Sequence, residues 1–275
     1  PKPSSAASDV YKRQVTFTTV QSGISVDLGL GTDTLVLGSG ANSLTFSGIE
    51  LLQVASTGNV ADVLTLTGSS SGGTINMGGG TDTLTLGAGS YSFAASGIES
   101  ITGSSGAENL SLTTGYTGTI NLSTGTDTLT VTGTNSLNLS GVETVLGGSG
   151  NDTVTFTTVQ SGISVNLDAG TDTLTLTAGT NSLAFSGIEL VQLGSSGGND
   201  VLTLTGSSSG GTINLGGGTD TIALNAGTYS FAASGVESIT GASGTENLSL
   251  TTGYTGTINL GTGTDTLTVT GTNSL

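Results

Sequence analysis

Apolar and polar residues alternate along almost the whole chain, in short runs. Clear examples are Ile-Asn-Met at 75–77, Leu-Thr-Leu at 84–86 and Leu-Ser-Leu at 110–112. A period of two predicts β-strands with one buried face. The runs are roughly four to six residues long, with Gly, Ser, Asn and Asp between them, and their centres recur about every nine residues. No window carries a helical stripe, so the pattern predicts an all-β chain with essentially no helix.

The chain is also built from repeats. The turn Gly-Thr-Asp-Thr recurs at intervals of 49, 45, 45, 48 and 45 residues, with its aspartates at Asp33, Asp82, Asp127, Asp172, Asp220 and Asp265. A longer period makes 154–160 a copy of 15–21 and 249–260 a near copy of 111–122. Short strands at a fixed repeat period predict a parallel β-solenoid, whose inward Leu, Ile, Val and Phe side chains stack along its axis. We expect one repetitive solenoid over 15–275, made of two copies at 15–153 and 154–275, with about 20 to 25 residues in each coil.

A second kind of turn interrupts the alternation. In Gly-Ile-Glu-Ser-Ile at 97–101 the two isoleucines have opposite parity, so a bend or bulge must fall near Glu99. The same Ser-Gly-(Ile/Val)-Glu sequence recurs at Glu50, Glu143, Glu189 and Glu237.

The two ends differ from the repetitive body. Residues 1–14 hold all the lysine, arginine and proline of the chain, and 5–14 resemble translated sequencing-adapter read-through. We expect 1–14 to be a non-native tail, or else a native disordered one; its lack of an apolar core excludes an export signal. Leu275 corresponds to Leu137, after which the repeat continues. We therefore expect the chain to be a piece of a longer protein, with flanking repeats as neighbours.

Charge narrows the choice of partners. The chain has 19 acidic residues, of which Asp9 alone precedes the body, so 15–275 carries 18 acids and no basic residue. This balance disfavours nucleic acid and anionic membrane surfaces as partners and attracts cations. Cysteine is absent, and no apolar run approaches the roughly 20 residues that span a membrane. A large, cysteine-free, acidic chain rich in Gly, Ser and Thr is associated with the outside of bacterial cells, so we expect a secreted or cell-surface location.

One stretch points to a specific cation. Residues 147–155, Gly-Gly-Ser-Gly-Asn-Asp-Thr-Val-Thr, match the nonapeptide Gly-Gly-x-Gly-x-Asp-x-apolar-x in full. This resembles the hemolysin-type (RTX) calcium-binding repeat, in which turn carbonyls and the aspartate hold Ca²⁺ between coils of a β-roll. Calcium takes six to eight oxygen ligands, so the chemistry is suitable. The resemblance implies ligands at Asp152 and Asp172 with the carbonyls of Gly148 and Gly150, followed by the pairs Asp62 with Asp82 and Asp200 with Asp220.

Two other interpretations of these residues remain open. Each turn aspartate could instead close an Asx-turn by accepting a hydrogen bond from its own backbone, with no metal. Against this, carboxylates on adjacent coils repel by about 1 kcal/mol in water, and a divalent cation would remove that penalty. Outward threonines such as Thr83, Thr85, Thr128 and Thr130 form Thr-x-Thr rows like those of ice-binding solenoids, although threonine is also a common exposed strand residue. Asparagines six residues before the turn aspartates are expected to face outward beside them: Asn76, Asn121, Asn166, Asn214 and Asn259.

Catalysis is not expected. The body has no His, Cys or Lys, which excludes thiol nucleophiles and Schiff bases, and its acids recur at repeat positions instead of breaking the repeat once. The sequence therefore predicts a non-enzymatic structural segment of a large secreted or surface-attached bacterial protein, adhesin-like and stiffened by Ca²⁺. The alternative is a metal-independent solenoid that binds ice or surface glycans through its Thr and Asn rows.

Overall fold

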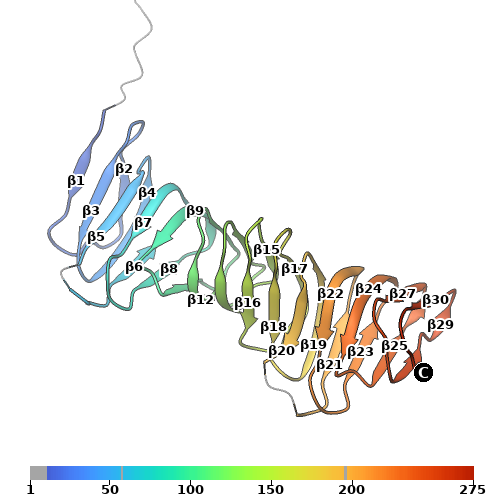
Figure 1. Cartoon of the computed structure of the whole chain (residues 1–275). Helices are drawn as coiled ribbons and strands as arrows, with labels where there is room; N and C mark the ends of the chain where they lie inside the picture. The colour runs from blue at the N-terminus through green and yellow to red at the C-terminus, as the bar shows by residue number, and fades with distance from the viewer. Residues whose placement is uncertain (1–10, 57, 195–196) are drawn as a thin grey trace, which may run out of the picture. The chain divides into compact units, whose positions relative to one another are not determined.

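The computed structural model describes residues 11–56, 58–194 and 197–275 (Figure 1). They form two compact units, Pro1–Val131 and Thr132–Leu275. The first strand begins at Gln14, the last residue of the predicted tail, whereas 1–10 lie outside the described residues.

The first unit contains strands β1 to β13 in two sheets. Odd-numbered strands form one sheet in the order β1-β3-β5-β7-β9-β11-β13, and even-numbered strands form the other in the order β2-β4-β6-β8-β10-β12. The odd strands are β1 (Gln14–Thr16), β3 (Thr34–Gly38), β5 (Leu51–Ala55), β7 (Ser70–Asn76), β9 (Gly89–Ser96), β11 (Glu108–Leu112) and β13 (Thr128–Val131). The even strands are β2 (Ile24–Asp27), β4 (Ala41–Ser47), β6 (Val63–Leu66), β8 (Thr83–Leu86), β10 (Ser100–Thr102) and β12 (Thr117–Asn121).

The second unit repeats this arrangement. One of its sheets has the order β15-β17-β19-β21-β23-β25-β28 and the other β14-β16-β18-β20-β22-β24-β27-β30, with a small pair β26-β29. The first sheet comprises β15 (Thr144–Leu146), β17 (Ser161–Asn166), β19 (Thr180–Ser186), β21 (Val201–Leu204), β23 (Thr221–Leu224), β25 (Ser238–Gly241) and β28 (Thr257–Asn259). The second comprises β14 (Ser136–Ser140), β16 (Thr153–Phe156), β18 (Thr173–Leu176), β20 (Leu190–Leu193), β22 (Ser208–Asn214), β24 (Gly227–Ser234), β27 (Glu246–Leu250) and β30 (Thr266–Val269). The small pair is β26 (Ser243–Gly244) with β29 (Thr262–Gly263).

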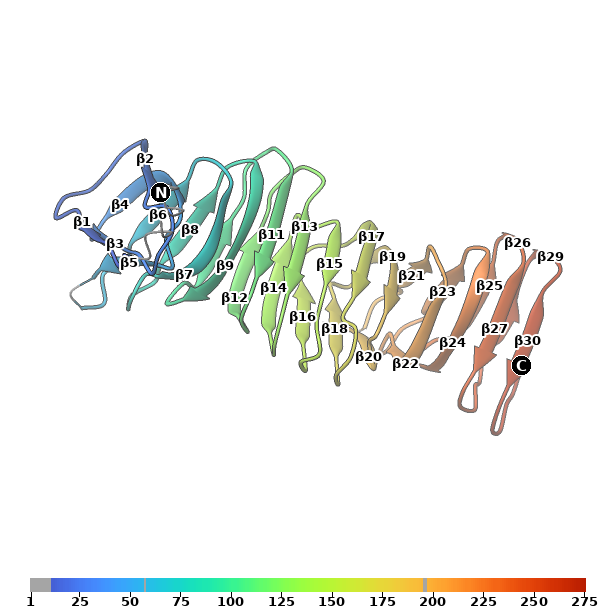
Figure 2. The same cartoon turned by 90° about the horizontal axis from the view of Figure 1, so that it is seen from above.

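Each unit is a parallel β-solenoid with two strands per coil. Successive strands alternate between the two sheets, and neighbours within a sheet pair in parallel (Figure 2). Parallel strands need a connection that returns to the same end, and here the strand of the opposite sheet makes that return. The predicted all-β solenoid is confirmed, and the described residues contain no helix, so none that could cross a membrane.

The coil is shorter than predicted. Paired residues on adjacent coils are 17 apart for Thr34 and Leu51 and 20 apart for Thr153 and Thr173; the longest step, between Leu51 and Thr74, is 23. A coil therefore has two strand-and-corner segments of about nine residues each, the spacing already visible in the alternation. The estimate of 20 to 25 residues was wrong for the many 17-residue coils.

A repeat of about 46 residues thus contains five strands, an odd number. Equivalent segments of successive repeats must then lie in opposite sheets, as β8 and β13 do: the first is in the even sheet, the second in the odd sheet. Thr83 and Thr85 consequently do not share a face with Thr128 and Thr130. The expected Thr-x-Thr rows do not stack from one repeat to the next.

The apolar side chains fill the space between the two sheets. In β8 and β18 alike, the two leucines are buried and the threonines between them point outward. Fully buried aromatic residues include Tyr91 and Phe93 and their counterparts Tyr229 and Phe231. Burial of each such side chain stabilises the fold by about 1.5–3 kcal/mol, so the alternating pattern is the main source of stability.

The bend predicted near Glu99 is a corner between β9 and β10. Gly97 has φ 56°, and a Cβ there would lie 2.2 Å from the carbonyl oxygen of Gly78, one coil earlier. Only glycine fits so close a backbone approach. Register shifts within paired strands occur elsewhere, as between Ser71 and Thr74.

Candidate cation-binding corners

Carboxyl groups are buried at the corners of both units. Burial of an unpaired carboxylate is costly unless hydrogen bonds or a cation compensate it. The acids that are at most 3% exposed are Asp33, Asp62, Asp82, Glu108, Asp127, Asp152, Asp172, Asp200, Asp220 and Glu246.

Backbone hydrogen bonds join these acids in pairs on adjacent coils. The Oδ1 atom of Asp172 accepts the N–H of Asp152 at 2.7 Å. The pairs Asp62 with Asp82 and Asp200 with Asp220 are joined in the same way, each at 2.8 Å. The structure therefore brings together each of the three aspartate pairs that the sequence analysis singled out.

A glutamate extends each pair to a third coil. Oε2 of Glu189 accepts the N–H of Asp172 at 2.7 Å, and Oε2 of Glu99 accepts that of Asp82 at the same distance. The other two such bonds run from Asp33 to Glu50 at 2.6 Å and from Asp220 to Glu237 at 2.8 Å. We call each such set of three stacked positions an acidic corner. Sequence analysis missed this role and assigned the glutamates to a separate turn, although the constant interval of 17 residues from aspartate to glutamate was available as a signal.

The second carboxylate oxygen of the paired aspartates has no partner. Among the described residues, Oδ2 is buried and accepts no hydrogen bond in Asp62, Asp82, Asp152, Asp172, Asp200 and Asp220. A buried acceptor left unsatisfied costs about 1–3 kcal/mol, and more when it is charged. Each acidic corner therefore holds oxygen atoms that would gain from a cation or a proton.

The ionisation of these carboxyls reflects the same imbalance. Burial raises the pKa of Asp172 above its ordinary value, the N–H of Asp152 partly offsets this, and repulsion from the carboxylates of Asp152 and Glu189 raises it again. The pKa of Asp82 is raised by the same causes, with Asp62 and Glu99 as neighbours. Burial also raises the pKa of Asp152, against hydrogen bonds from Asn135 that lower it.

Successive acidic corners lie on opposite sides of the solenoid. In the second unit, Asp152, Asp172 and Glu189 precede the even strands β16, β18 and β20. The next set, Asp200, Asp220 and Glu237, precedes the odd strands β21, β23 and β25. This alternation follows from the five strands of each repeat.

The glycine carbonyls assigned to the strongest motif have separate surroundings. The carbonyl of Gly148 accepts the N–H of Ala169 at 3.3 Å. That of Gly150 faces Gly170, where a Cβ would lie only 2.2 Å from it and 2.9 Å from Oδ1 of Asp172. In the part of the chain that the structure describes, no three acidic side chains converge to form a metal-binding group.

Asx-turns are present, but other residues form them. Oδ1 of Asn76 accepts the N–H of Gly78 at 3.0 Å, and Oδ1 of Asn166 accepts that of Asp168 at 3.1 Å. Asp27, at the same place in the first repeat, accepts the N–H of Gly29 at 3.0 Å. The Asx-turn interpretation of Asp82 and Asp172 was therefore wrong, because their Oδ1 atoms bond the previous coil. It applies to the asparagines that were expected to form outward rows.

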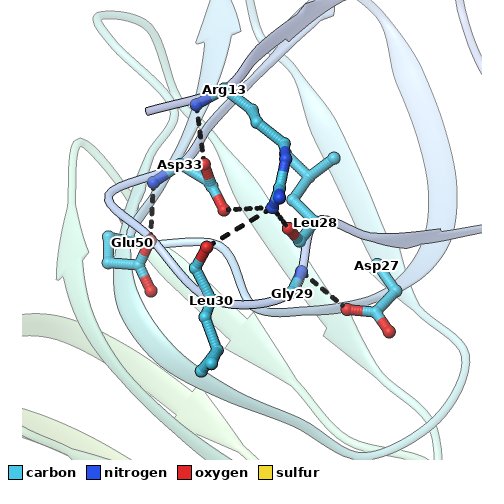
Figure 3. A network of polar contacts seen from close by, with 7 residues as sticks. All are labelled: Arg13, Asp27, Leu28, Gly29, Leu30, Asp33 and Glu50. Atoms are coloured by element: carbon cyan, nitrogen blue, oxygen red, sulfur yellow. Dashed lines mark hydrogen bonds and ion pairs between the residues drawn. The ribbon is translucent and has the colours of Figure 1, made fainter. Parts of the chain in front are cut away.

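The first corner contains a basic side chain (Figure 3). Arg13 donates its backbone N–H to Oδ1 of Asp33 at 2.7 Å, the bond that Asp152 makes to Asp172. Its guanidinium Nη1 lies 3.5 Å from Oδ2 of Asp33, donates to the carbonyl of Leu28, and reaches the carbonyl of Leu30 at 3.4 Å. A positive group is thus held by one carboxylate oxygen and two backbone carbonyls. Sequence analysis missed this contact because it set Arg13 aside with the tail.

Comparison with models of protein families, with curated proteins and with solved structures finds no match.

Proposed function

We propose that this chain is a non-enzymatic structural segment of a large secreted or cell-surface bacterial protein, adhesin-like, and that its acidic corners bind Ca²⁺. The observation that carries the calcium proposal is the guanidinium of Arg13. It marks a cation position between Oδ2 of Asp33 and the carbonyls of Leu28 and Leu30 (Figure 3). The body beyond Gln14 has no basic side chain that could take this position elsewhere.

The same loop shape recurs at the other Gly-Thr-Asp-Thr turns. The residue four before the aspartate has a left-handed φ of 67–94° in all six turns, at Gly29, Gly78, Ser123, Asp168, Gly216 and Gly261. At Asp172 the oxygens equivalent to those around Arg13 are Oδ2 of Asp172 and the carbonyls of Leu167 and Ala169. Non-glycine residues rarely adopt this conformation, so its presence at Asp168 supports a backbone shape fixed by the corner.

This donor set suits calcium. It consists of carboxylate and carbonyl oxygens, the hard ligands that Ca²⁺ takes at 2.3–2.6 Å with water completing six to eight positions. The bare Oδ2 of Asp172 meets the requirement for an unsatisfied buried oxygen. Asp152 on the preceding coil adds a further carboxylate. With no His or Cys in the chain, zinc and copper are poorly matched.

Calcium would couple folding to location. An ion that binds only the folded solenoid stabilises it in proportion to the logarithm of its concentration. The chain would be less stable where calcium is scarce and would become rigid outside the cell. The absence of cysteine and the acidic surface are consistent with this location.

The test is thermal unfolding of the full chain, followed by far-UV circular dichroism in calcium, in magnesium and in chelator. We expect the unfolding midpoint to rise with calcium, to rise much less with magnesium, and to fall again on chelation. A midpoint that calcium and chelator leave unchanged would refute the calcium proposal and leave a metal-independent solenoid.

The alternative function, binding of ice or surface glycans, has one supporting observation. Thr65, Thr85 and Thr102 are aligned across β6, β8 and β10, with Oγ1 of Thr102 at 3.2 Å from Oγ1 of Thr85. Such a neutral hydroxyl row favours a hydroxyl-rich partner. Retention on immobilised glycans in the presence of chelator, lost on Thr85→Val, would favour this function.

A further inference from the structure

We propose that Arg13 is the permanent cation of the first acidic corner, so that this corner folds without metal and excludes it. The inference rests on the proposed function for the other corners. It adds that one corner is closed by a side chain of the same polypeptide.

The backbone register shows what Arg13 replaces. Its N–H bonds Oδ1 of Asp33 as the N–H groups of Asp62, Asp152 and Asp200 bond the next aspartate. Arg13 therefore occupies the first of the three stacked positions. In those three corners this position is acidic, and here it is basic.

The consequence for charge is direct. Where Asp152 is stacked on Asp172, two carboxylates repel each other. Where Arg13 is stacked on Asp33, the same two positions attract, and Oδ2 of Asp33 gains an ion pair at 3.5 Å. A hydrogen bond that involves an ionised donor is roughly twice as strong as a neutral one. The guanidinium thus supplies the compensation that the other corners lack.

The guanidinium also blocks entry. Nη1 already contacts the carbonyls of Leu28 and Leu30, the oxygens that a metal ion would need (Figure 3). Arginine stays protonated at all accessible pH values, so a second cation at this place would meet both its volume and its charge. Calcium should therefore bind the other corners and not this one.

The first experiment counts bound calcium in the full chain by equilibrium dialysis. Arg13→Gln removes the charge and should raise the number of bound ions by one. Lys12→Gln is the matched control, because Lys12 is the exposed neighbour and carries the same charge; it should leave the count unchanged. Equal counts for Arg13→Gln and the parent, with both binding calcium, would overturn the inference and leave the proposed function intact.

A metal-free measurement separates the two proposals. In chelator, the amide hydrogens of Asp33 and Thr34 should exchange at least tenfold faster in Arg13→Gln than in the parent. Those of Asp172 and Thr173 should not change. If no form binds calcium, the proposed function fails, and this exchange result alone decides whether Arg13 holds the first corner. Unchanged exchange at Asp33 would overturn the inference.

The converse substitution tests transfer of the device. Asp200→Arg places a guanidinium above Asp220, in the position that Arg13 has above Asp33. It should lower the calcium count by one. Asp200 also accepts the N–H of Gly179 at 2.6 Å, and that bond is lost. If this variant does not fold, the Arg13→Gln measurements still decide.

Discussion

At the scale of single residues, the unusual feature is a carboxylate with one oxygen bonded and the other bare. Oδ1 of Asp172 holds the backbone of the preceding coil at 2.7 Å, and its Oδ2 is buried without a partner. One atom joins the coils while the other penalises the ionised form. Substitutions that treat the two oxygens differently can separate these effects.

Asp172→Asn is the sharpest such substitution. The amide keeps the acceptor for the N–H of Asp152 and removes the charge, so in chelator we expect the free energy of unfolding to rise by about 1 kcal/mol. With calcium, the parent should gain stability and the variant should gain less. Denaturant unfolding with and without calcium measures both. The control is Asp27→Asn, an exposed aspartate at a place where the other repeats carry asparagine; it should respond to calcium like the parent. A variant destabilised in chelator would mean that the negative charge itself holds the corner.

The raised pKa values of Asp82, Asp152 and Asp172 predict an unusual dependence on pH. A carboxyl whose pKa is higher in the folded than in the unfolded chain binds its proton more tightly when folded. Its stabilising effect is complete below the unfolded pKa and is lost as the pH rises through the folded pKa. Without metal, we therefore expect the free energy of unfolding to increase as the pH falls from neutral towards about 4, the ordinary pKa of aspartate.

Urea unfolding in chelator at a series of pH values tests this expectation. Asp172→Asn should show a weaker dependence on pH than the parent, because one of the responsible groups is gone. A parent protein that loses stability steadily on acidification would contradict the assignment.

At the scale of strands and corners, glycine controls how closely the coils approach. Gly218 has φ 142°, and a Cβ there would lie 1.9 Å from the carbonyl oxygen of Gly198. Its neighbour Gly217 has no atom within 4 Å of the same position. Two adjacent glycines therefore have opposite tolerance for a methyl group.

Gly218→Ala should reduce the free energy of unfolding by about 1–3 kcal/mol, the usual cost of forcing atoms into a filled space. Gly217→Ala should change it by no more than about 0.5 kcal/mol. Thermal unfolding of the two variants side by side measures the difference. Equal effects would show that the close approach of the two coils is not what requires glycine.

The elements were more predictable than the corners. Alternation predicted β8 and β18 because their leucines face one core, and the 20-residue intervals predicted the aspartate pairs. Glu99 and Glu189 were missed because alternation describes a strand and carries no information on which coil a corner residue contacts. Arg13 was missed for a different reason: composition separates it from the body, whereas its backbone register joins it to Asp33.

At the scale of a whole unit, the odd number of strands per repeat makes segments interchangeable between sheets. The strands β18 and β23 lie in opposite sheets of the second unit and have the same burial pattern. A strand of this sequence therefore fits either sheet equally well.

Deletion of residues 173–220 tests this interchangeability. It removes one 48-residue interval and joins Asp172 directly to Thr221, which moves β23 into the sheet that β18 occupied. We expect a folded protein with a β-type circular dichroism spectrum and a cooperative thermal transition. Deletion of 173–196 is the control, because it removes about half of the interval and breaks the spacing of the corner. A non-cooperative product from the full-interval deletion would show that each strand is specific to its own sheet.

The alternation of acidic corners has a mechanical consequence. In the second unit, the bonds from Asp152 to Asp172 and on to Glu189 tie three coils together along one edge, and those from Asp200 to Asp220 and on to Glu237 tie the next coils along the opposite edge. A ribbon laced along a single edge opens easily when it is bent away from that edge. Lacing that changes edge every two and a half coils leaves no preferred direction of bending, so side loads from either direction meet the same resistance.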